Sequence, residues 1–192
     1  MNGNIKKNIK KVTISTYAYK NLYFAVGVLN GKIIGVSLPK CSELDALNEI
    51  ADRCESMQFE VSDKYLELAE KVCAAFHGEK IKFNLKNLDL EVKSEGSPVK
   101  TSFERDVLME VAKIPYGEIR TYKQIASAIE TKGYQAVGTA VGKNPFPIII
   151  PCHRVVKSDL RVGEYRGGSE MKNEILKNEG IQIEHGKIKK DN

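Results

Sequence analysis

A cysteine followed directly by a histidine is the pair of residues best suited to chemistry in this sequence. Cys152 and His153 come after the apolar run 148–150 and Pro151. Because an apolar run that ends in proline should rise from the core and stop there, we expect Cys152 to be presented at a rim. A thiol beside an imidazole that can take its proton has the parts of an activated nucleophile. The pair leaves a second interpretation open, because a free cysteine is most often a small core residue.

Length and composition set the class of protein. The chain has 192 residues, enough for one large domain or two small ones, and its 42% of hydrophobic residues is ordinary for a globular protein. No apolar run approaches the roughly 20 residues that span a bilayer. The Lys-rich start, residues 1–11, has no apolar segment behind it and is expected to be a solvated tail rather than a signal peptide. We therefore expect a cytoplasmic protein with no membrane contact.

The cysteines and histidines do not have the spacing of a metal site or a disulfide framework. The sequence has no Cys-x-x-Cys pair, and its few histidines are scattered. This pattern indicates a reducing compartment and predicts no structural metal. The residues concerned are Cys41, Cys54, Cys73, Cys152, His77, His153 and His185.

The charge is mildly basic and uneven along the chain. The formal net charge is +5; residues 1–95 carry 14 Lys and Arg against 13 Asp and Glu, and residues 96–192 carry 16 against 12. Such a small excess is typical of a solvated surface and does not establish nucleic-acid binding. It indicates only that the second part is the place to look for a polyanion.

Strand patterns dominate the start of the chain. β-branched and apolar residues predict strands over 12–17, 22–29 and 32–38. Asn30-Gly31 between the last two is the strongest short signal of a hairpin, because both residues tolerate positive φ. Residues 81–92 are expected to add one or two more strands.

Two helices are expected after these strands. One begins at Ser42 and ends near Cys54, and the second covers 62–77 and is closed by Gly78. Cys73 falls on the apolar face of the second helix, so it is expected to be a core residue.

A polar break containing Gly and Pro over 94–98 predicts a domain boundary. We therefore expect one domain at 1–95 and another, mainly helical, at 96–192. The second should begin with a helix over 102–114 and end with a helix that starts at Ser169 as N-cap.

Two short helices between those ends have the outline of a helix-turn-helix. Residues 121–124 form a capping box that opens a helix to Ile129, and a second helix is expected over 134–142. The second helix is rich in small residues, which suit either close packing inside the protein or the approach of a nucleic-acid backbone. The pattern alone does not decide between these two explanations. The small residues are Ala136, Gly138, Ala140 and Gly142.

From about Ser102 to Gly180 the chain resembles the O6-alkylguanine-DNA alkyltransferases, also called methylated-DNA–protein-cysteine methyltransferases. Several separate motifs occur in the family's order over this stretch, whereas the first part resembles the family only in its pattern of elements and its length. The motifs are Tyr116-Gly117-Glu118, Thr121-Tyr122, Ala136-Val137-Gly138, Asn144-Pro145-Phe146-Pro147, Pro151-Cys152-His153-Arg154-Val155, Tyr165-Arg166-Gly167-Gly168 and Asn178-Glu179-Gly180.

This resemblance implies a fold and an activity. The fold would be an α/β, ribonuclease-H-like N-terminal domain with a small antiparallel sheet, and a mainly helical C-terminal domain with a helix-turn-helix. The partner would be double-stranded DNA containing alkylated guanine, bound through its minor groove with the damaged base flipped out. The alkyl group of O6-alkylguanine, and of O4-alkylthymine, would move to the cysteine once. The protein would act as a monomer without a cofactor.

The resemblance also implies a role for each site residue. Cys152 would be the nucleophile, His153 the base that takes its proton through a water, and Glu179 the residue that orients His153. Glu179 stands near a helix C-terminus, where the dipole disfavours a carboxylate. Such a glutamate is usually a surface residue, and the alternative is that a partner holds it. Tyr122 would donate a hydrogen bond to the flipped base, and Asn144 would pin the turn before the active-site strand.

Further positions are assigned by the same resemblance to DNA contact and to the base pocket. The DNA contacts would be Thr121, Tyr122, Lys123, Tyr134, Gln135, Ala136, Gly138 and Arg154. The base pocket would be lined by Pro147, Val155, Tyr165 and Arg166, with the backbone of Val155 and Arg166 contacting guanine.

The chain departs from the family at the residue that fills the gap left by the flipped base. The family has an arginine where this chain has Gln135, which lacks the charge and the stacking plane of arginine. Tyr134 is the alternative wedge. A second departure is Arg166, which stands where serine is common.

Three other classes of protein compete with a single-turnover alkyltransferase. Alkyltransferase-like lesion-binding proteins replace the cysteine, often by Trp, whereas this chain has Cys152 and no Trp. A cysteine hydrolase would need an oxyanion hole, for which the sequence has no specific signal. A helix-turn-helix regulator would not need the Pro-Cys-His-Arg segment.

Overall fold

The computed structural model describes residues 11–54, 57–92 and 96–189, so most of the expected N-terminal tail lies outside the described residues. The chain begins with a four-stranded sheet in the order β3-β2-β1-β4. Its strands are β1 (Lys11–Tyr19), β2 (Leu22–Leu29), β3 (Lys32–Val36) and β4 (Gln58–Val61).

The sheet is mixed, which corrects the antiparallel sheet expected from the sequence. β1 pairs antiparallel with β2, and β2 with β3, but β4 pairs parallel with the other edge of β1. The connection from β3 to β4 passes through a helix, and such a crossover returns the chain in the same direction. The hairpin between β2 and β3 is confirmed, because Asn30 and Gly31 have φ values of 50° and 78°.

The segment expected to add strands after the second helix is irregular. It contains a 3-10 turn, Leu85–Asn87, and a single bridge between Leu88 and Ile33, but no strand over 81–92. The side chain of Asn84 accepts a hydrogen bond from the Lys86 amide, so a local bond bends the chain where an extended backbone was expected.

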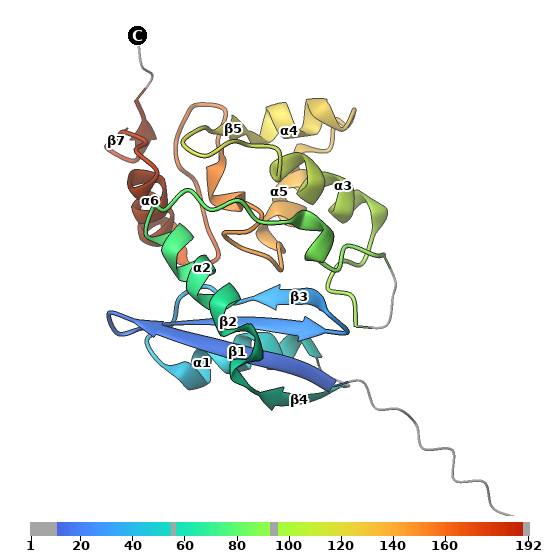
Figure 1. Ribbon diagram of the computed structural model, residues 1–192. Coiled ribbons are helices and arrows are strands. Elements are labelled where there is room, and N and C mark those ends of the chain that lie inside the picture. The colour runs from blue at the N-terminus through green and yellow to red at the C-terminus, as the bar shows by residue number, and fades with distance from the viewer. Residues whose placement is uncertain (1–10, 55–56, 93–95, 190–192) are drawn as a thin grey trace, which may run out of the picture.

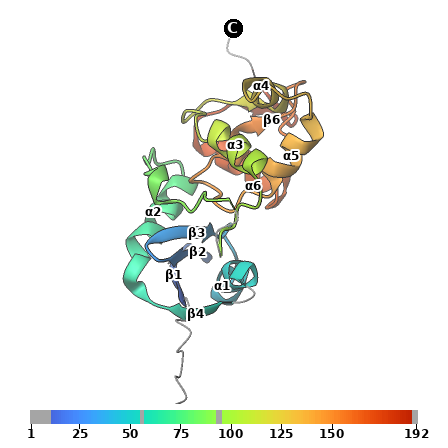
Figure 2. The same cartoon turned by 90° about the vertical axis from the view of Figure 1, so that its right-hand side faces the viewer.

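Two helices cover opposite faces of the sheet (Figures 1 and 2). α1 (Glu43–Ala51) is capped by the Ser42 side chain and continues in a 3-10 turn to Cys54, close to the expected bounds. α2 (Leu66–Phe76) follows a 3-10 turn, Asp63–Tyr65, and buries Cys73 as expected. α1 packs with one small apolar cluster, and α2 packs with the largest one.

The second half of the chain is mainly helical. Its helices are α3 (Ser102–Val111), α4 (Tyr122–Ala128), α5 (Tyr134–Gly142) and α6 (Gly168–Asn178). The expected capping box at Thr121 and Gln124 is present, and α5 packs against α3 and α4. α6 starts one residue before the expected N-cap, with Gly167 as the cap and no side-chain bond to it. Short strand pairs complete this half: β5 (Arg120–Thr121) with β6 (Val155–Val156), and β7 (Ile183–Glu184) with β8 (Lys187–Ile188).

One apolar core joins the two halves. Phe24 and Phe76 of the first half belong to the same buried cluster as Val107, Val137 and Ile150 of the second. Part of the expected domain boundary over 94–98 lies outside the described residues. Within the described ranges, none of the helices is long and apolar enough to cross a bilayer.

Candidate active site

Cys152 is buried, which corrects the expectation that it stands at a rim. The segment 146–150 does not rise as a strand; it folds into turns, and the Ile150 amide donates to the Phe146 carbonyl at 2.8 Å. Cys152–Arg154 is then a single 3-10 turn before β6. The turn places Phe146 and Ile150 in the core. Cys152 follows directly and is buried with them, so that it is only 6% exposed.

Asn144 holds this turn together through its side-chain amide. Its side-chain Nδ2 donates to the Ile150 carbonyl at 2.8 Å and to the Cys152 Sγ at 3.1 Å, and its Oδ1 accepts from the Phe146 amide at 3.0 Å. Asn144 is 2% exposed, so these bonds are shielded from water. The amide therefore fixes the turn and touches the sulfur atom directly.

The environment keeps the Cys152 thiol protonated in the resting protein. Burial raises its pKa, while the hydrogen bond from Asn144 and the charges of Arg166 and Lys172 lower it by less. A thiol of raised pKa holds little thiolate near neutral pH. The nucleophile therefore needs a base to take its proton.

His153, the residue predicted to take this proton, is also buried. It is 1% exposed, and its Nε2 lies 2.9 Å from Oε1 of Glu179. Burial lowers the pKa of His153, although Glu179 raises it in part, so the ring is neutral near pH 7. In the neutral ring, a proton on Nε2 that is donated to Glu179 leaves a lone pair on Nδ1. Nδ1 is buried and has no hydrogen-bond partner among the described residues, so it is free to accept a proton.

Glu179 has a strong partner that the sequence pattern alone did not identify. Arg154 donates from Nε to one oxygen of Glu179 at 2.9 Å and from Nη2 to the other at 2.8 Å. Burial raises the pKa of Glu179, but the hydrogen bonds from His153 and Arg154 bring it down to about 2. This bidentate pair offsets the poor position of a carboxylate at the C-cap of α6.

The same contacts turn Arg154 away from the predicted DNA contact. Its Nη1 donates to the Ile114 carbonyl at 2.7 Å, and its side chain is 13% exposed. The guanidinium therefore faces Glu179 and the interior rather than the surface, and its place in the structure favours an orienting role.

A cavity of about 30 Å³ lies beside the thiol. Three of the predicted pocket residues line it, together with Tyr122, whereas Val155 is fully buried and does not. Leu38 also lines the cavity, although it follows β3 in the first half of the chain. The space holds about two waters but no nucleobase, which is several times larger than a water. The lining residues are Leu38, Tyr122, Val141, Gly142, Asn144, Pro147, Cys152, Glu164, Tyr165 and Arg166.

Lys172 is a buried cation, with a charge that lowers the pKa of Cys152, which the sequence analysis did not identify. Its side chain on α6 is fully buried, and its Nζ donates to the Val155 carbonyl at 2.6 Å. Burial lowers its pKa to about 8. The signal was its position, because Lys172 shares the apolar face of α6 with Ile175 and Leu176.

The surface of α4 and α5 is open. Thr121, Tyr122 and Gly138 are half-buried, and the other predicted contacts on these helices are exposed, including Tyr134 at 47%. A Cβ added to Gly142 would meet nothing within 4 Å, and one added to Gly138 would meet only the Tyr122 ring at 4.0 Å. Packing inside the protein therefore does not require these two glycines, which favours the approach of an outside partner.

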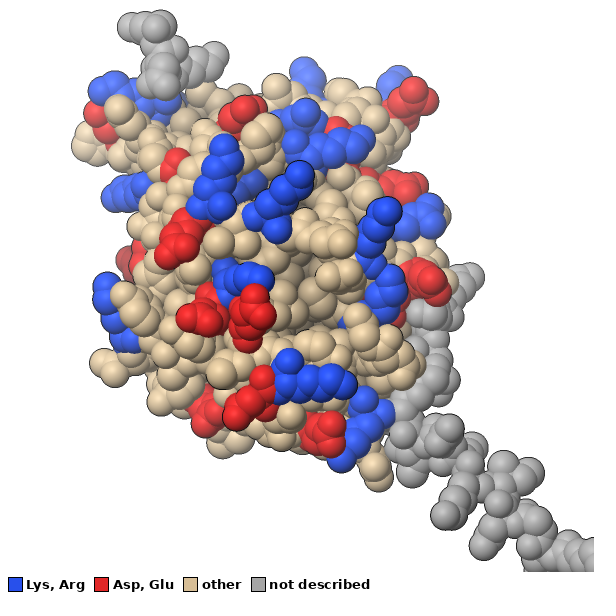
Figure 3. Space-filling model, viewed as in Figure 1, with Lys and Arg blue, Asp and Glu red and all other residues tan. Residues whose placement is uncertain are grey.

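The face of the molecule in Figure 3 mixes the two signs of charge. Lys and Arg side chains border an uncharged hollow in its upper half, while acidic and basic side chains alternate below. This distribution suits local contacts with an anion more than a broad electrostatic attraction.

Comparisons with known proteins agree with the motifs. The sequence model of the 6-O-methylguanine DNA methyltransferase, DNA binding domain, matches residues 102–181. The chain is 40% identical to a methylated-DNA–protein-cysteine methyltransferase of Methanosarcina barkeri over 128 residues, which are 66% of this chain and 72% of that protein. It is 32% identical to the Sulfolobus acidocaldarius protein of the same name over 158 residues, 82% of this chain and 94% of the other.

Solved structures show the same fold. The O6-methylguanine-DNA methyltransferase of Pyrococcus kodakaraensis superimposes with a TM-score of 0.65 and 26% identity over 88% of this chain and 99% of that one. The Mycobacterium tuberculosis OGT in complex with DNA gives a TM-score of 0.66 and 25% identity over 88% and 92% of the two chains.

Proposed function

The chain belongs to the methylated-DNA–protein-cysteine methyltransferases, and we propose that it repairs DNA by moving the alkyl group of O6-alkylguanine to its own Cys152. O4-alkylthymine is a second substrate. The transfer happens once per molecule, because the thioether formed has no route back to the thiol. The protein works as a monomer on double-stranded DNA.

The observation that carries this proposal is the buried series of contacts from Asn144 to Cys152 and from His153 to Glu179. In the reaction, the Cys152 sulfur forms a bond to the alkyl carbon while the bond from that carbon to O6 breaks. The thiol proton passes through a water to Nδ1 of His153, and Glu179 stabilises the imidazolium that results. A soft thiolate suits displacement at an alkyl carbon.

The guanine leaves with a negative charge spread over its oxygen and ring nitrogens, and Tyr122 stabilises this charge by donating a hydrogen bond to the flipped base. Tyr122 lines the cavity beside Cys152. Burial, and to a smaller extent the charges of Cys152 and Glu164, raise the pKa of Tyr122. Its hydroxyl therefore stays protonated and can donate a hydrogen bond.

The base must enter a widened pocket. The cavity holds about two waters, so a flipped guanine enters only when side chains at its mouth move aside. Leu38 and Tyr165 line this cavity and are the groups that would move. The energy of DNA binding supplies the work, and a poorly paired damaged base costs less to flip.

The DNA side is the pair α4 and α5, docked as a helix-turn-helix in the minor groove. The support is the openness of this surface and the lack of any internal need for glycine at 138 and 142. Gln135 or Tyr134 fills the gap that the flipped base leaves, since both are exposed at the start of α5.

The test is the mass of the protein after it is mixed with excess duplex that contains one O6-methylguanine. We expect a gain of one methyl group, confined to the peptide that holds Cys152 and absent in Cys152→Ser. Cys73→Ser is the matched control, because Cys73 is also a buried thiol. Its pKa is raised to about 11, chiefly by burial.

An unmodified protein that still shifts the damaged duplex would overturn the proposal and indicate a lesion-binding protein. Methylation that persists in Cys152→Ser would overturn the assignment of the nucleophile.

A further inference from the structure

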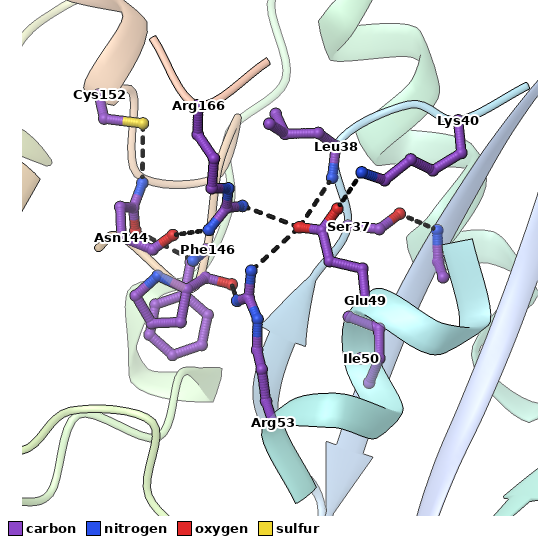
Figure 4. Close-up of polar contacts among 12 residues, drawn as sticks. Ser37, Leu38, Lys40, Glu49, Ile50, Arg53, Asn144, Phe146, Cys152 and Arg166 are labelled. Carbon is purple, nitrogen blue, oxygen red and sulfur yellow. Dashed lines mark hydrogen bonds and ion pairs between the residues drawn. The ribbon is translucent and has the colours of Figure 1, made fainter. Parts of the chain in front are cut away.

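A carboxylate from the first half of the chain is linked through two arginines to the turn that carries the active site (Figure 4). Glu49 lies on α1, and its side chain is 15% exposed. Its Oε1 accepts from Arg53 at 3.0 Å and from Arg166 at 2.9 Å, and its Oε2 lies 2.9 Å from the Lys40 ammonium. Three cations therefore meet on one largely buried carboxylate.

The two arginines reach from Glu49 to consecutive carbonyls of the active-site turn. Arg166 donates from Nη1 to the Asn144 carbonyl at 3.1 Å, and Arg53 donates from Nη1 to the Pro145 carbonyl at 3.1 Å. Each guanidinium thus uses one nitrogen for Glu49 and another for the turn. The fixed fork of arginine makes such a bridge directional.

A single hydrogen bond links this turn to the Cys152 sulfur atom. The arginines hold the carbonyls of Asn144 and of the next residue, and the Asn144 side chain donates to the Cys152 Sγ at 3.1 Å. The Val36 amide at the end of β3 also donates to the Pro145 carbonyl, at 2.9 Å. The first half of the chain therefore fixes the backbone from which Asn144 reaches the sulfur.

Glu49 is the group that lets two like charges stand together at this place. Burial lowers the pKa of Arg53, the nearby charge of Arg166 lowers it further, and Glu49 opposes both. Without the carboxylate, the guanidinium groups repel each other and lose a shared acceptor. Their hold on the two carbonyls should then weaken.

We propose that Glu49 is a positioning residue for alkyl transfer, which holds Arg53 and Arg166 on the carbonyls of the active-site turn and so holds Asn144 against the Cys152 thiol. The inference rests on the proposed function of Cys152. It assigns part of the alkyl-transfer machinery to the first half of the chain.

The first experiment compares Glu49→Gln with Glu43→Gln, an exposed carboxylate on the same helix that touches neither arginine. The measurement is the first-order rate of methyl transfer at saturating O6-methylguanine duplex and 25 °C. We expect Glu49→Gln to slow transfer about tenfold or more, with the DNA dissociation constant within about twofold of the parent. Glu43→Gln should match the parent in both.

A pH profile separates positioning from a loss of stability. The hydrogen bond from Asn144 lowers the pKa of Cys152, so a loosened turn should raise this pKa. The labelling of Cys152 by iodoacetamide, followed by peptide mass, should therefore shift to higher pH in Glu49→Gln. A substitution that only destabilised the fold would leave the labelling profile of the folded protein in place.

A double-mutant cycle tests the route through Arg166. If Glu49 acts partly through this arginine, Glu49→Gln should slow transfer less in the Arg166→Gln background than in the parent, because only the bridge through Arg53 is left to lose. Should Glu49→Gln fail to fold, Arg53→Lys takes its place, since lysine keeps the charge but cannot bridge Glu49 and the Pro145 carbonyl as a fork. It should also slow transfer at saturating DNA.

Three results would overturn the inference: a transfer rate for Glu49→Gln equal to the parent, an additive double mutant, or a faster rate. The last would mean that the network is a latch against the base. If the parent itself transfers nothing, the proposed function fails instead. The iodoacetamide profile would then still report whether Glu49 positions the thiol.

Discussion

At the scale of single residues, the site combines a protonated thiol with a neutral base inside the protein. Burial raises the pKa of Cys152 and lowers the pKa of His153, so both groups are uncharged at rest. An uncharged pair avoids the large desolvation cost of a buried thiolate and imidazolium until the alkyl group is in place. The thiol is therefore protected from other electrophiles in two ways, because it is protonated and because it is buried.

The lowered pKa of His153 predicts the pH dependence of transfer. An unperturbed histidine titrates near pH 6.5, so the single-turnover rate should stay level from about pH 8 to below 6.5 and then fall as Nδ1 is protonated. Glu179 partly raises the pKa of His153, so Glu179→Gln should move the midpoint lower still. A rate that already declines at pH 7 would contradict a buried, neutral His153.

Glu179 predicts how stability depends on pH. Its pKa of about 2 in the folded protein lies below its value in the unfolded chain, so its ionised form stabilises the fold above pH ~4.3. This contribution, about 3 kcal/mol at neutral pH, should be lost as pH falls through ~4 toward 2. Urea unfolding should show Glu179→Gln less stable than the parent at pH 7, with a clearly smaller difference at pH 3. An equal difference at both pH values would refute this account.

At the scale of elements, α5 shows a sequence feature that internal packing does not explain. Gly138 sits in the middle of the helix, where glycine costs about 1 kcal/mol relative to alanine. A Cβ there would meet only the Tyr122 ring, at an ordinary contact distance. The glycine therefore lowers helix stability without a benefit to the fold.

We expect Gly138→Ala to raise the free energy of unfolding by about 0.5–1 kcal/mol and to weaken binding to duplex DNA several-fold. The added methyl group would stand between the helix and the DNA backbone. Thermal unfolding and a binding titration at one salt concentration measure the two effects. Ser127→Ala on the exposed face of α4 is a control for surface change. Gain of stability with unchanged DNA binding would remove α5 from the interface.

Local signals in the sequence predicted the elements that depend on local bonds. The Thr121 capping box and the Asn30-Gly31 turn are present as predicted, because each is made within a few residues. β4 was missed because it is a short edge strand whose Phe59 and Val61 are exposed, so it lacks a buried alternation. The pairing of β4 with β1 depends on residues far away in the chain.

The sequence predicted some parts of the site and missed others, because local patterns are visible in the sequence and contacts between distant residues are not. Cys152 and His153 were singled out by their types and order, and the resemblance assigned to Glu179 the role of orienting His153, which it contacts. The burial of Cys152 was not predicted, since it depends on a turn that Asn144 closes from within. Glu49 gave no signal at all, because its partners are brought together only by the tertiary fold.

At the scale of the whole molecule, the two halves of the chain share their core and their site. The α2 helix meets the end of α6, where the Asn178 side chain donates to the Phe76 carbonyl at 3.0 Å. Leu38 lines the cavity beside the thiol, and Glu49 binds Arg166 across the junction. These contacts make the first half of the chain part of the surroundings of the thiol.

The shared core predicts that the halves unfold together. Phe24 is fully buried in β2, within the cluster that also contains Val107 and Ile150, so Phe24→Ala should cost about 3–5 kcal/mol. Hydrogen exchange in rising urea should show peptides of β1–β3 and of α3–α5 losing protection at one midpoint, and Phe24→Ala should lower that midpoint for both. Phe59→Ala, at a site 50% exposed on β4, should lower it far less. If the α3–α5 peptides kept the parent midpoint in Phe24→Ala, the halves would be separate folding units. The link from Glu49 to the thiol would then connect two folding units rather than lie within one.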